Sequence, residues 1–183
     1  MRCATRTATA ALLCAAALLA GCSSLTRKPA PQVADGDLRL AGRLSVQVAG
    51  GAGGKASGGN AGFELIGNPQ TGQLELSTPL GSLVARALWR EREVRLQTPE
   101  DERRFDDLDA LTRELLGEAI PVAALFDWLR GKPWPQAASQ ATANGFEQLG
   151  WQIDLARFSE GLIVATRRAE PVVTLRARID EQQ

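Results

Sequence analysis

The segment at residues 38–48 constrains the fold of this chain more than any other part of the sequence. Its even positions are apolar apart from Gly42, and its odd positions are mostly polar. A period of two residues is typical of a β-strand that has one face against a core and the other in water. The segment therefore predicts a sheet with one buried face.

The same alternation returns in shorter segments along most of the chain, separated by residues that favour turns, such as Asn68-Pro69 and Pro79-Leu80-Gly81. Short strands that follow one another through tight turns form antiparallel sheets. We predict about eight antiparallel strands, the clearest of which are residues 38–48, 61–66, 73–76, 83–89, 92–97, 151–155, 162–167 and 173–179.

Two helices are predicted in the middle of the chain, at residues 105–117 and 121–131, where the apolar period changes from two to about 3.6. Pro121 opens the second helix, and Gly117 and Gly131 end the two helices. Their apolar faces must cover something, so we expect a curved sheet with helices over its open side. These faces consist of Leu108, Leu111, Leu115 and Leu116 in the first helix and of Val122, Leu125, Phe126, Trp128 and Leu129 in the second.

The N-terminus has the features of a lipoprotein signal peptide. Arg2 and Arg6 precede an apolar run at residues 8–20, which is too short to span a membrane and ends in Leu-Ala-Gly-Cys. We predict a signal peptide at residues 1–21, an acylated Cys22, a flexible tether at residues 22–36 and one domain at residues 37–183. An ordinary signal peptide with a chance cysteine is the alternative. Serine follows the cysteine, where aspartate commonly signals retention in the inner membrane, so an outer-membrane location is expected.

Composition excludes several classes of function. The chain has no histidine, and only Cys22 among its cysteines lies outside the signal peptide, so we expect neither metal site nor cofactor. Its 21 basic residues balance its 21 acidic ones, which argues against nucleic-acid binding. Gly54-Lys55 lacks the glycine at position 49 and the hydroxyl at position 56 of a phosphate loop. We expect residues 50–59 to form a mobile hairpin loop.

Leu80 stands at the tip of a predicted turn, where a polar residue or glycine is usual. It either folds back onto the core, is an ordinary exposed leucine, or forms a hydrophobic finger that contacts lipid or an apolar partner. Carboxylate pairs, namely residues 100–102 and Glu114 with Glu118, are interpreted as solvated faces.

Several motifs, which occur in the family's order and lie within residues 38–179 apart from the lipobox, resemble the LolB family of outer-membrane lipoprotein receptors. They are the lipobox at Cys22, Gly42-Arg43-Leu44-Ser45-Val46, Ser77-Thr78-Pro79-Leu80-Gly81, Leu116-Gly117 with Ile120-Pro121-Val122, Leu125-Phe126-Asp127-Trp128-Leu129-Arg130-Gly131-Lys132-Pro133, and Phe146-Glu147-Gln148-Leu149-Gly150-Trp151. The chain departs from the family pattern at Leu65, where many members carry tryptophan, and in its C-terminal residues 180–183, which lack a closing tryptophan.

The resemblance implies an open antiparallel half-barrel covered by a helical lid. It also implies a monomeric receptor that takes lipoproteins from a LolA-type periplasmic carrier and inserts them into the inner leaflet of the outer membrane. Pro79, Leu80 and Gly81 then form the membrane-insertion loop. We expect the acyl chains to lie in an apolar cavity lined by Leu44, Val46, Phe63, Leu65, Leu76, Leu125, Trp128, Leu129 and Trp151.

Two other functions remain open. A structural or assembly lipoprotein binds a protein partner through a flat apolar patch, and a carboxylate-based hydrolase has two carboxylates roughly 5–10 Å apart in a polar cleft. A deep apolar cavity under the helices favours the receptor, because such a cavity suits hydrocarbon chains.

Overall fold

The structure is a computed structural model that describes residues 38–50, 56–90, 93–116 and 119–180, with Leu116 described by its backbone alone. These residues belong to one unit, Val33–Gln183. The predicted signal peptide, the acylated Cys22 and the tether lie outside the described residues, as do Gly117, Glu118, residues 51–55 and residues 181–183.

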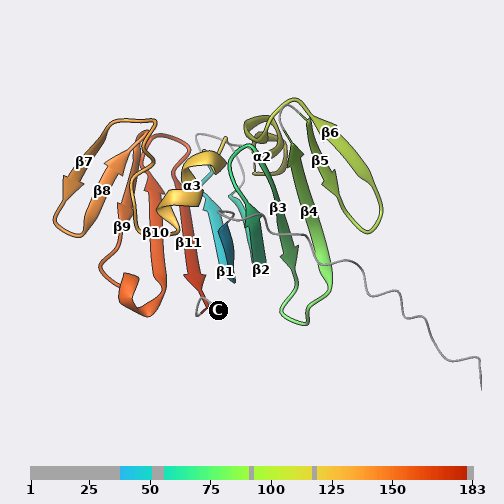
Figure 1. Cartoon of the computed structure of the whole chain (residues 1–183), viewed down its shortest axis with the longest axis horizontal. Helices are drawn as coiled ribbons and strands as arrows, with labels where there is room; N and C mark the ends of the chain where they lie inside the picture. Colours follow the sequence, from blue (N-terminus) through green and yellow to red (C-terminus); the bar gives the residue numbers. More distant parts are fainter. Residues whose placement is uncertain (1–37, 51–55, 91–92, 117–118, 181–183) are drawn as a thin grey trace, which may run out of the picture. The chain divides into compact units, whose positions relative to one another are not determined.

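One antiparallel sheet of 11 strands forms the framework of the described residues (Figure 1). Its strand order is β6-β5-β4-β3-β2-β1-β11-β10-β9-β8-β7, so every pair except β1 with β11 joins strands that are neighbours in sequence. The strands are β1 (Leu38–Val48), β2 (Ser57–Gly67), β3 (Thr71–Ser77), β4 (Leu83–Arg90), β5 (Glu93–Gln97), β6 (Glu102–Phe105), β7 (Ser139–Thr142), β8 (Gly145–Gln148), β9 (Trp151–Asp154), β10 (Leu162–Arg167) and β11 (Val173–Ile179).

Strand β1 lies at the centre of the sheet and confirms the predicted alternation. Leu40, Val46 and Val48 are buried, whereas Arg39 and Gln47 are exposed. Gly42 is also required by packing, because a Cβ at this position would overlap the carbonyl oxygen of Arg178 on β11. The centre of the sheet is thus formed by the strand with the strongest sequence signal.

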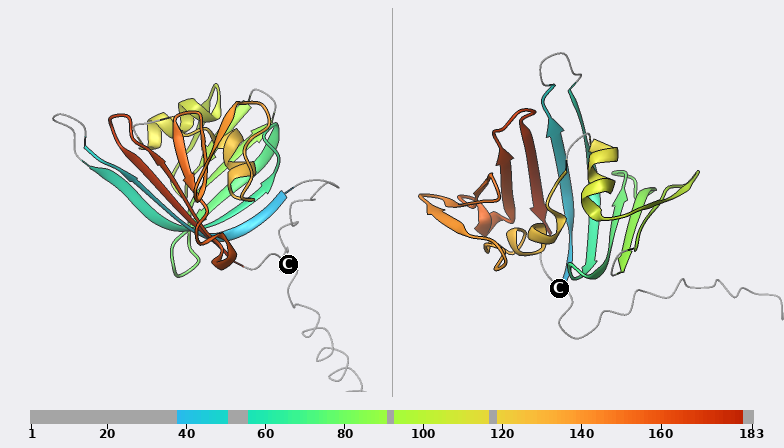
Figure 2. Two further views of the ribbon diagram at one scale, coloured as in Figure 1. Left: turned by 90° about the vertical axis from the view of Figure 1, so that its left-hand side faces the viewer. Right: turned by 90° about the horizontal axis from the view of Figure 1, so that it is seen from above.

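The sheet is curved, and the two helices lie on its concave side (Figure 2). They are α2 (Leu108–Leu116) and α3 (Val122–Trp128), both between β6 and β7 in the sequence, and a short 3₁₀ helix, η2 (Phe158–Glu160), precedes β10. Among the described residues, no helix has the length and apolarity needed to cross a membrane. The predictions of a mainly β fold and of two inserted helices are confirmed.

The first helix begins three residues later than predicted. Phe105 is still part of β6, where it pairs with Val94 of β5, so the chain stays extended up to this point. The backbone N–H of Ala110 then donates to Asp107 Oδ1 at 2.6 Å, which satisfies an N–H group of the first turn. Asp107 therefore caps α2, and the helix begins at Leu108.

The eight predicted segments do not cover the short strands β6, β7 and β8, and part of β2 was assigned to a loop. β6 and β7 occupy the two edges of the sheet, and most of their residues are polar and exposed, so they carry no apolar period. Ser57 to Gly59 were assigned to a mobile loop, which is wrong, because they pair with Val48, Gln47 and Val46 of β1. Backbone pairing holds these residues in the sheet although they have almost no side chains to bury.

Candidate functional site

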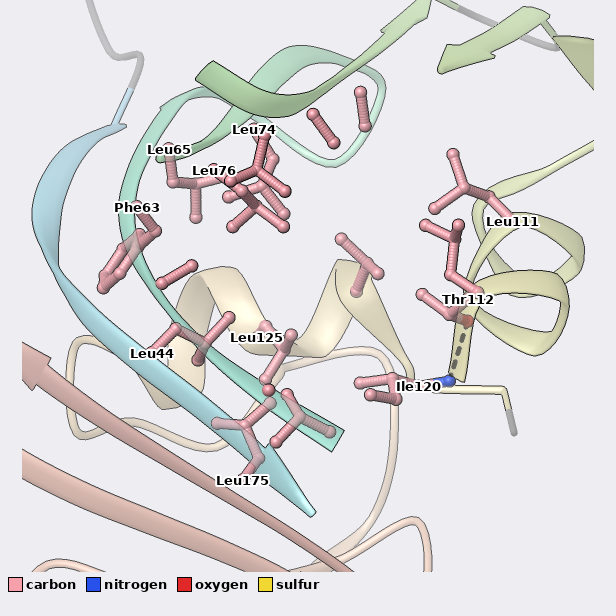
Figure 3. A pocket seen from close by; sticks show the side chains of 18 of the residues that line it. Leu44, Phe63, Leu65, Leu74, Leu76, Leu111, Thr112, Ile120, Leu125 and Leu175 are labelled. Carbon is pink, nitrogen blue, oxygen red and sulfur yellow. Dashed lines mark hydrogen bonds between the residues drawn. The ribbon is translucent and has the colours of Figure 1, made fainter. Parts of the chain in front are cut away.

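A cavity of about 270 Å³ lies between the concave face of the sheet and the two helices (Figure 3). None of its lining residues is titratable, and only Asn60 and Thr112 have polar side chains. The lining consists of Leu44, Val46, Gly59, Asn60, Ala61, Phe63, Leu65, Leu74, Leu76, Val84, Ala85, Ala87, Leu96, Leu111, Thr112, Leu115, Ile120, Val122, Leu125, Leu129 and Leu175. Such a wall can hold an apolar group but offers no charge to a polar one.

The space arises where large and small side chains face each other on neighbouring strands. Leu76 of β3 pairs with Ala85 of β4, and Leu74 pairs with Ala87. An alanine opposite each leucine fills less of the concave side than a second leucine does. The cavity is therefore a consequence of side-chain size as well as of sheet curvature.

Thr112 brings a hydroxyl group into this wall without leaving it unsatisfied. The hydroxyl donates to the carbonyl oxygen of Asp109 at 3.2 Å and accepts from the N–H of Ile120 at 3.0 Å. The hydroxyl group thus both donates and accepts a hydrogen bond within the protein. The bond from Ile120 also connects α2 to the segment that leads into α3.

Seven of the nine predicted lining residues line this cavity. Leu44, Val46, Phe63, Leu65, Leu76, Leu125 and Leu129 are among its wall residues.

The other two predicted lining residues, Trp128 and Trp151, are not part of the wall. They pack against each other with ring centroids 6.0 Å apart, and Trp128 Nε1 donates to Gln148 Oε1 at 2.8 Å. The apolar stripe of α3 is wide, so Leu125 and Leu129 turn toward the cavity while Trp128 turns toward β8 and β9. The helical period places all three on the apolar face of the helix but does not show which neighbour each one meets.

The sequence analysis left out several wall residues that its own pattern could have found. Leu74 lies two positions before Leu76 on β3, and Ala85 and Ala87 alternate in the same way on β4. Leu111 and Leu115 belong to the predicted apolar face of the first helix. Extending each alternating or helical face to its full length gives these positions.

The turn between β3 and β4 holds Leu80 in solvent. Leu80 is 95% exposed, so the alternative in which it folds back onto the core is wrong. The Gly81 N–H donates to the Thr78 carbonyl oxygen at 2.9 Å, and the Thr78 N–H donates to the Ser82 carbonyl oxygen at 2.8 Å. Gly81 has a φ of +83°, a conformation that glycine adopts readily. Backbone hydrogen bonds within the turn thus hold its conformation, and the Leu80 side chain stays in solvent.

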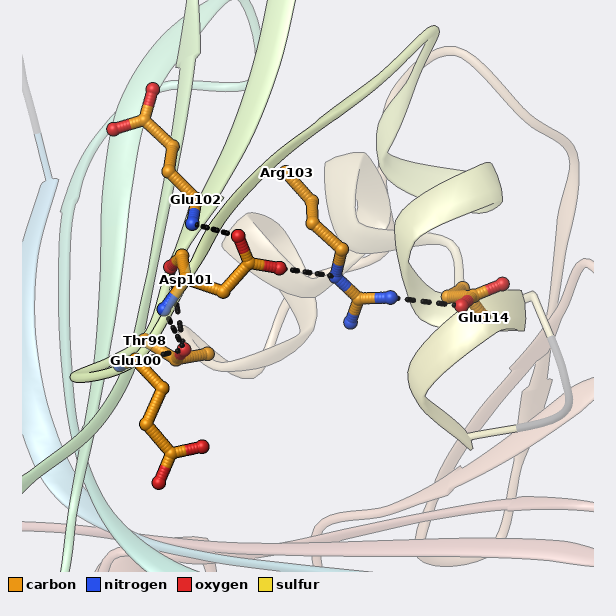
Figure 4. Close-up of polar contacts among 6 residues, drawn as sticks. All are labelled: Thr98, Glu100, Asp101, Glu102, Arg103 and Glu114. Atoms are coloured by element: carbon orange, nitrogen blue, oxygen red, sulfur yellow. Dashed lines mark hydrogen bonds and ion pairs between the residues drawn. The ribbon is translucent and has the colours of Figure 1, made fainter.

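The carboxylates of residues 100–102 and Glu114 lie on the surface, where Asp101 and Glu114 hold local structure (Figure 4). Asp101 Oδ1 accepts from the backbone N–H of Glu102 at 2.7 Å, and Thr98 Oγ1 accepts from the N–H of Asp101 at 3.0 Å. Arg103 on β6 pairs with Glu114 on α2, with 2.9 Å between Nη1 and Oε1. These groups do not line the cavity.

The other titratable groups of the described residues also lie outside the cavity wall. Burial, with the neighbouring Asp107 carboxylate as the second cause, raises the pKa of the Asp109 carboxyl on α2. Within the part of the chain that the structure describes, no group of three or more histidine, cysteine, aspartate or glutamate side chains could hold a metal ion. The predicted partner of Glu114, Glu118, lies outside the described residues.

Comparison with known proteins gives a consistent result. Residues 37–176 match the model of the family described as outer membrane lipoprotein LolB. The chain is 36% identical over 173 residues to the outer-membrane lipoprotein LolB of Bordetella petrii, covering 88% of this chain and 84% of that protein. It is 34% identical over 151 residues to the protein of the same name from Chromobacterium violaceum, covering 80% of this chain and 81% of the relative. The Bordetella pertussis protein of that name is 33% identical over 165 residues, with 85% and 82% coverage.

Proposed function

Because the chain belongs to the LolB family, whose members are receptors in lipoprotein localisation to the outer membrane, we propose how it performs this role. It accepts lipoproteins from a LolA-type periplasmic carrier, holds their acyl chains in the apolar cavity and inserts them into the inner leaflet of the outer membrane. The observation that carries this proposal is the cavity wall, which has no titratable group. A structural lipoprotein needs a flat apolar patch for a partner, and it does not need an interior space.

The energetics favour a cavity of this kind. Each methylene group moved from water to an apolar site gains roughly 0.8 kcal/mol, so acyl chains must stay covered throughout transfer. A cavity of about 150 Å³ holds one benzene, and by this scale 270 Å³ holds roughly a dozen carbon atoms. This is less than one long acyl chain. In our proposal the curved sheet is an open half-barrel, and α2 and α3 form a lid that moves outward as chains enter.

The anchor of the receptor is the second part of the proposal. Acylation of Cys22 would hold the domain, as a monomer, on the periplasmic face of the outer membrane. Several acyl chains give stable anchoring, whereas one chain gives only marginal binding. A flexible tether at residues 22–36 spans roughly 20 Å, which lets the domain reach a carrier while its anchor stays in the bilayer.

The change Cys22→Ala tests this anchor. We expect the full chain to lose its acyl groups and to leave the membrane fraction, because the thiol that accepts the diacylglyceryl group is gone. Cell fractionation and mass spectrometry of the mature N-terminus measure both effects. An unmodified N-terminus in the native protein would contradict the anchor but leave the cavity proposal intact.

The change Leu125→Asp tests the cavity. Placing a carboxylate in the apolar wall penalises every methylene that contacts it, so we expect affinity for a fluorescent fatty acid to fall at least about tenfold. Transfer of lipoproteins from the carrier should fall with it. Ala123→Asp is the matched control, since Ala123 is on the same helix but does not line the cavity. If a folded Leu125→Asp chain binds the fluorescent fatty acid as well as the parent chain does, the cavity proposal is wrong.

A further inference from the structure

The cavity wall reaches solvent at four of its residues. Most of its lining residues are buried or half-buried, and the exposed ones are Gly59 and Asn60 on β2, Val84 on β4 and Leu115 on α2. The side chains of Val84 and Leu115 are 45% and 43% exposed, although both also line the interior. The opening is therefore bordered by one apolar side chain from the sheet and one from a helix.

Val84 reaches the cavity because of a β-bulge. Leu76 pairs with Ala85 and Ser77 pairs with Leu83, so Val84 has no partner on β3. Regular alternation would direct Val84 to the face opposite to that of Ala85, yet both residues line the cavity. A bulge inserts one residue and changes the direction of a side chain, and it does so here at the edge of the opening.

The opening and Leu80 lie at the same end of the sheet. Strands β2 and β3 pair only as far as Gly62 with Ser77, so Gly59 and Asn60 run on past the end of β3. The turn at residues 78–82 leaves the sheet at this same point and returns as β4. Val84 follows Leu80 by four positions, so the bulge connects the turn to the opening.

The helical side of the opening is the last turn of α2. Leu111 lies one helical turn before Leu115 and is buried, so the same helix face leads from the interior to the surface. The neighbouring Glu114 pairs with Arg103 of β6, which holds this turn from the outside. The two sides of the opening thus belong to different elements. Val84 is on β4, which pairs with β3, and Leu115 is on α2, which the ion pair between Arg103 and Glu114 holds.

We propose that acyl chains enter and leave the cavity between Val84 and Leu115, which act as a gate, and that a departing chain emerges beside Leu80. The inference rests on the proposed function, in that it takes the cavity to be the acyl site. Two half-exposed apolar side chains partly cover the methylenes that have left the interior but have not yet reached the bilayer. Release next to Leu80 also keeps the uncovered length of chain short.

The test compares rates with affinity. Val84→Trp and Leu115→Trp narrow the opening but leave the deep wall unchanged, so they should slow entry and exit alike. Dansylated undecanoic acid is mixed with the full chain carrying Cys22→Ala, with the dansyl group excited directly, and association and dissociation are followed by stopped flow. We expect both rates to fall about tenfold, with the dissociation constant within about twofold of the parent value.

Leu149→Trp is the matched control, because Leu149 is also a half-exposed leucine but does not line the cavity. Its rates should equal those of the parent chain. Weaker binding with an unchanged association rate overturns the gate, since Val84 and Leu115 are then only part of the bound site, and unchanged rates overturn it as well. A parent chain that does not bind the probe contradicts the proposed function itself, and the gate with it.

A second version guards against misfolding of the tryptophan variants. Val84→Cys and Leu115→Cys chains are folded first and then alkylated with a bulky maleimide, and the parent chain is treated in the same way to account for Cys3 and Cys14. Slower entry and exit after alkylation at either position supports the gate. Rates that match the alkylated parent overturn it.

Discussion

Two parts of the same sheet share the alternating apolar pattern, but one part borders a cavity and the other is filled with large side chains. We call the residues of β1–β5 and α2 around the cavity the hollow part, and those of β8–β10 with Trp128 the filled part. In both, alternate apolar residues point to the concave side. The hollow part places leucine opposite alanine, whereas Trp128, Phe146, Trp151 and Ile153 occupy the filled part. Side-chain size, and not the strand pattern, thus decides where the space lies.

A polar network also distinguishes the filled part. The Gln148 side chain is only 2% exposed and makes four hydrogen bonds of 2.8 Å. Its Oε1 accepts from Trp128 Nε1 and the Trp134 N–H, and its Nε2 donates to the carbonyl oxygens of Trp134 and Ala137. This amide connects β8 to the end of α3 and to the segment that follows it. Helix α3, which covers the hollow part, is therefore held at its C-terminal end by the filled part.

The largest effect is expected from Gln148→Leu. The substitution leaves two donors and two acceptors without partners in a buried place, so the free energy of unfolding should fall by about 3 kcal/mol or more. Urea denaturation measures the loss. Gln152→Leu is the control, because Gln152 accepts one exposed hydrogen bond from Arg168. Loss of this bond should lower the free energy of unfolding by less than about 1 kcal/mol. Equal losses in the two variants would mean that the network does not distinguish the parts.

A smaller effect is expected when one tryptophan is added to each part. Ile153 has 0% exposure, so Ile153→Trp overpacks the filled part and should cost about 1–3 kcal/mol. Leu76 borders the cavity, so Leu76→Trp should cost less than about 1 kcal/mol and reduce binding of a fluorescent fatty acid. Thermal unfolding measures the difference at about 2–4 °C per kcal/mol. If Leu76→Trp lowers the melting temperature as much as Ile153→Trp, the cavity is not free space.

The comparison also shows which features a sequence can predict. The strand β1 and the inward positions of Phe63 and Leu76 were predictable, because alternation is a local property of the chain. The edge strands β6 and β7 were not, since polar residues carry no apolar period. It was also not predictable that Leu125 faces the cavity while Trp128 faces β8 and β9, because this depends on which strands the helix covers.

Val84 is the clearest limit of the sequence analysis. Its place at the opening depends on a bulge, which exists only once β3 and β4 have paired. In contrast, the exposed turn with Leu80 could be predicted from proline and glycine, because turn chemistry is also local.

The smallest effect on stability is expected at Leu80, and it compares two exposed leucines in turns, one in each part. Leu80→Glu should change the free energy of unfolding by less than about 0.5 kcal/mol, since almost no native contact is lost. Capture from a LolA-type carrier should persist, because the cavity is unchanged. Insertion into liposomes should fall by about one to two decades, the value of burying one leucine. Purified carrier, receptor and liposomes allow capture and insertion to be measured separately.

Leu149→Glu supplies the matched control for this experiment. Leu149 lies in the turn between β8 and β9 and is half exposed, but it belongs to the filled part, away from the cavity wall. If exposure of a leucine were enough for insertion, both substitutions would reduce it equally, and the position of Leu80 beside the opening would be irrelevant. If Leu80→Glu reduces capture as much as insertion, Leu80 belongs to the surface that meets the carrier. Loss of insertion in Leu80→Glu alone ties delivery to the hollow part of the sheet.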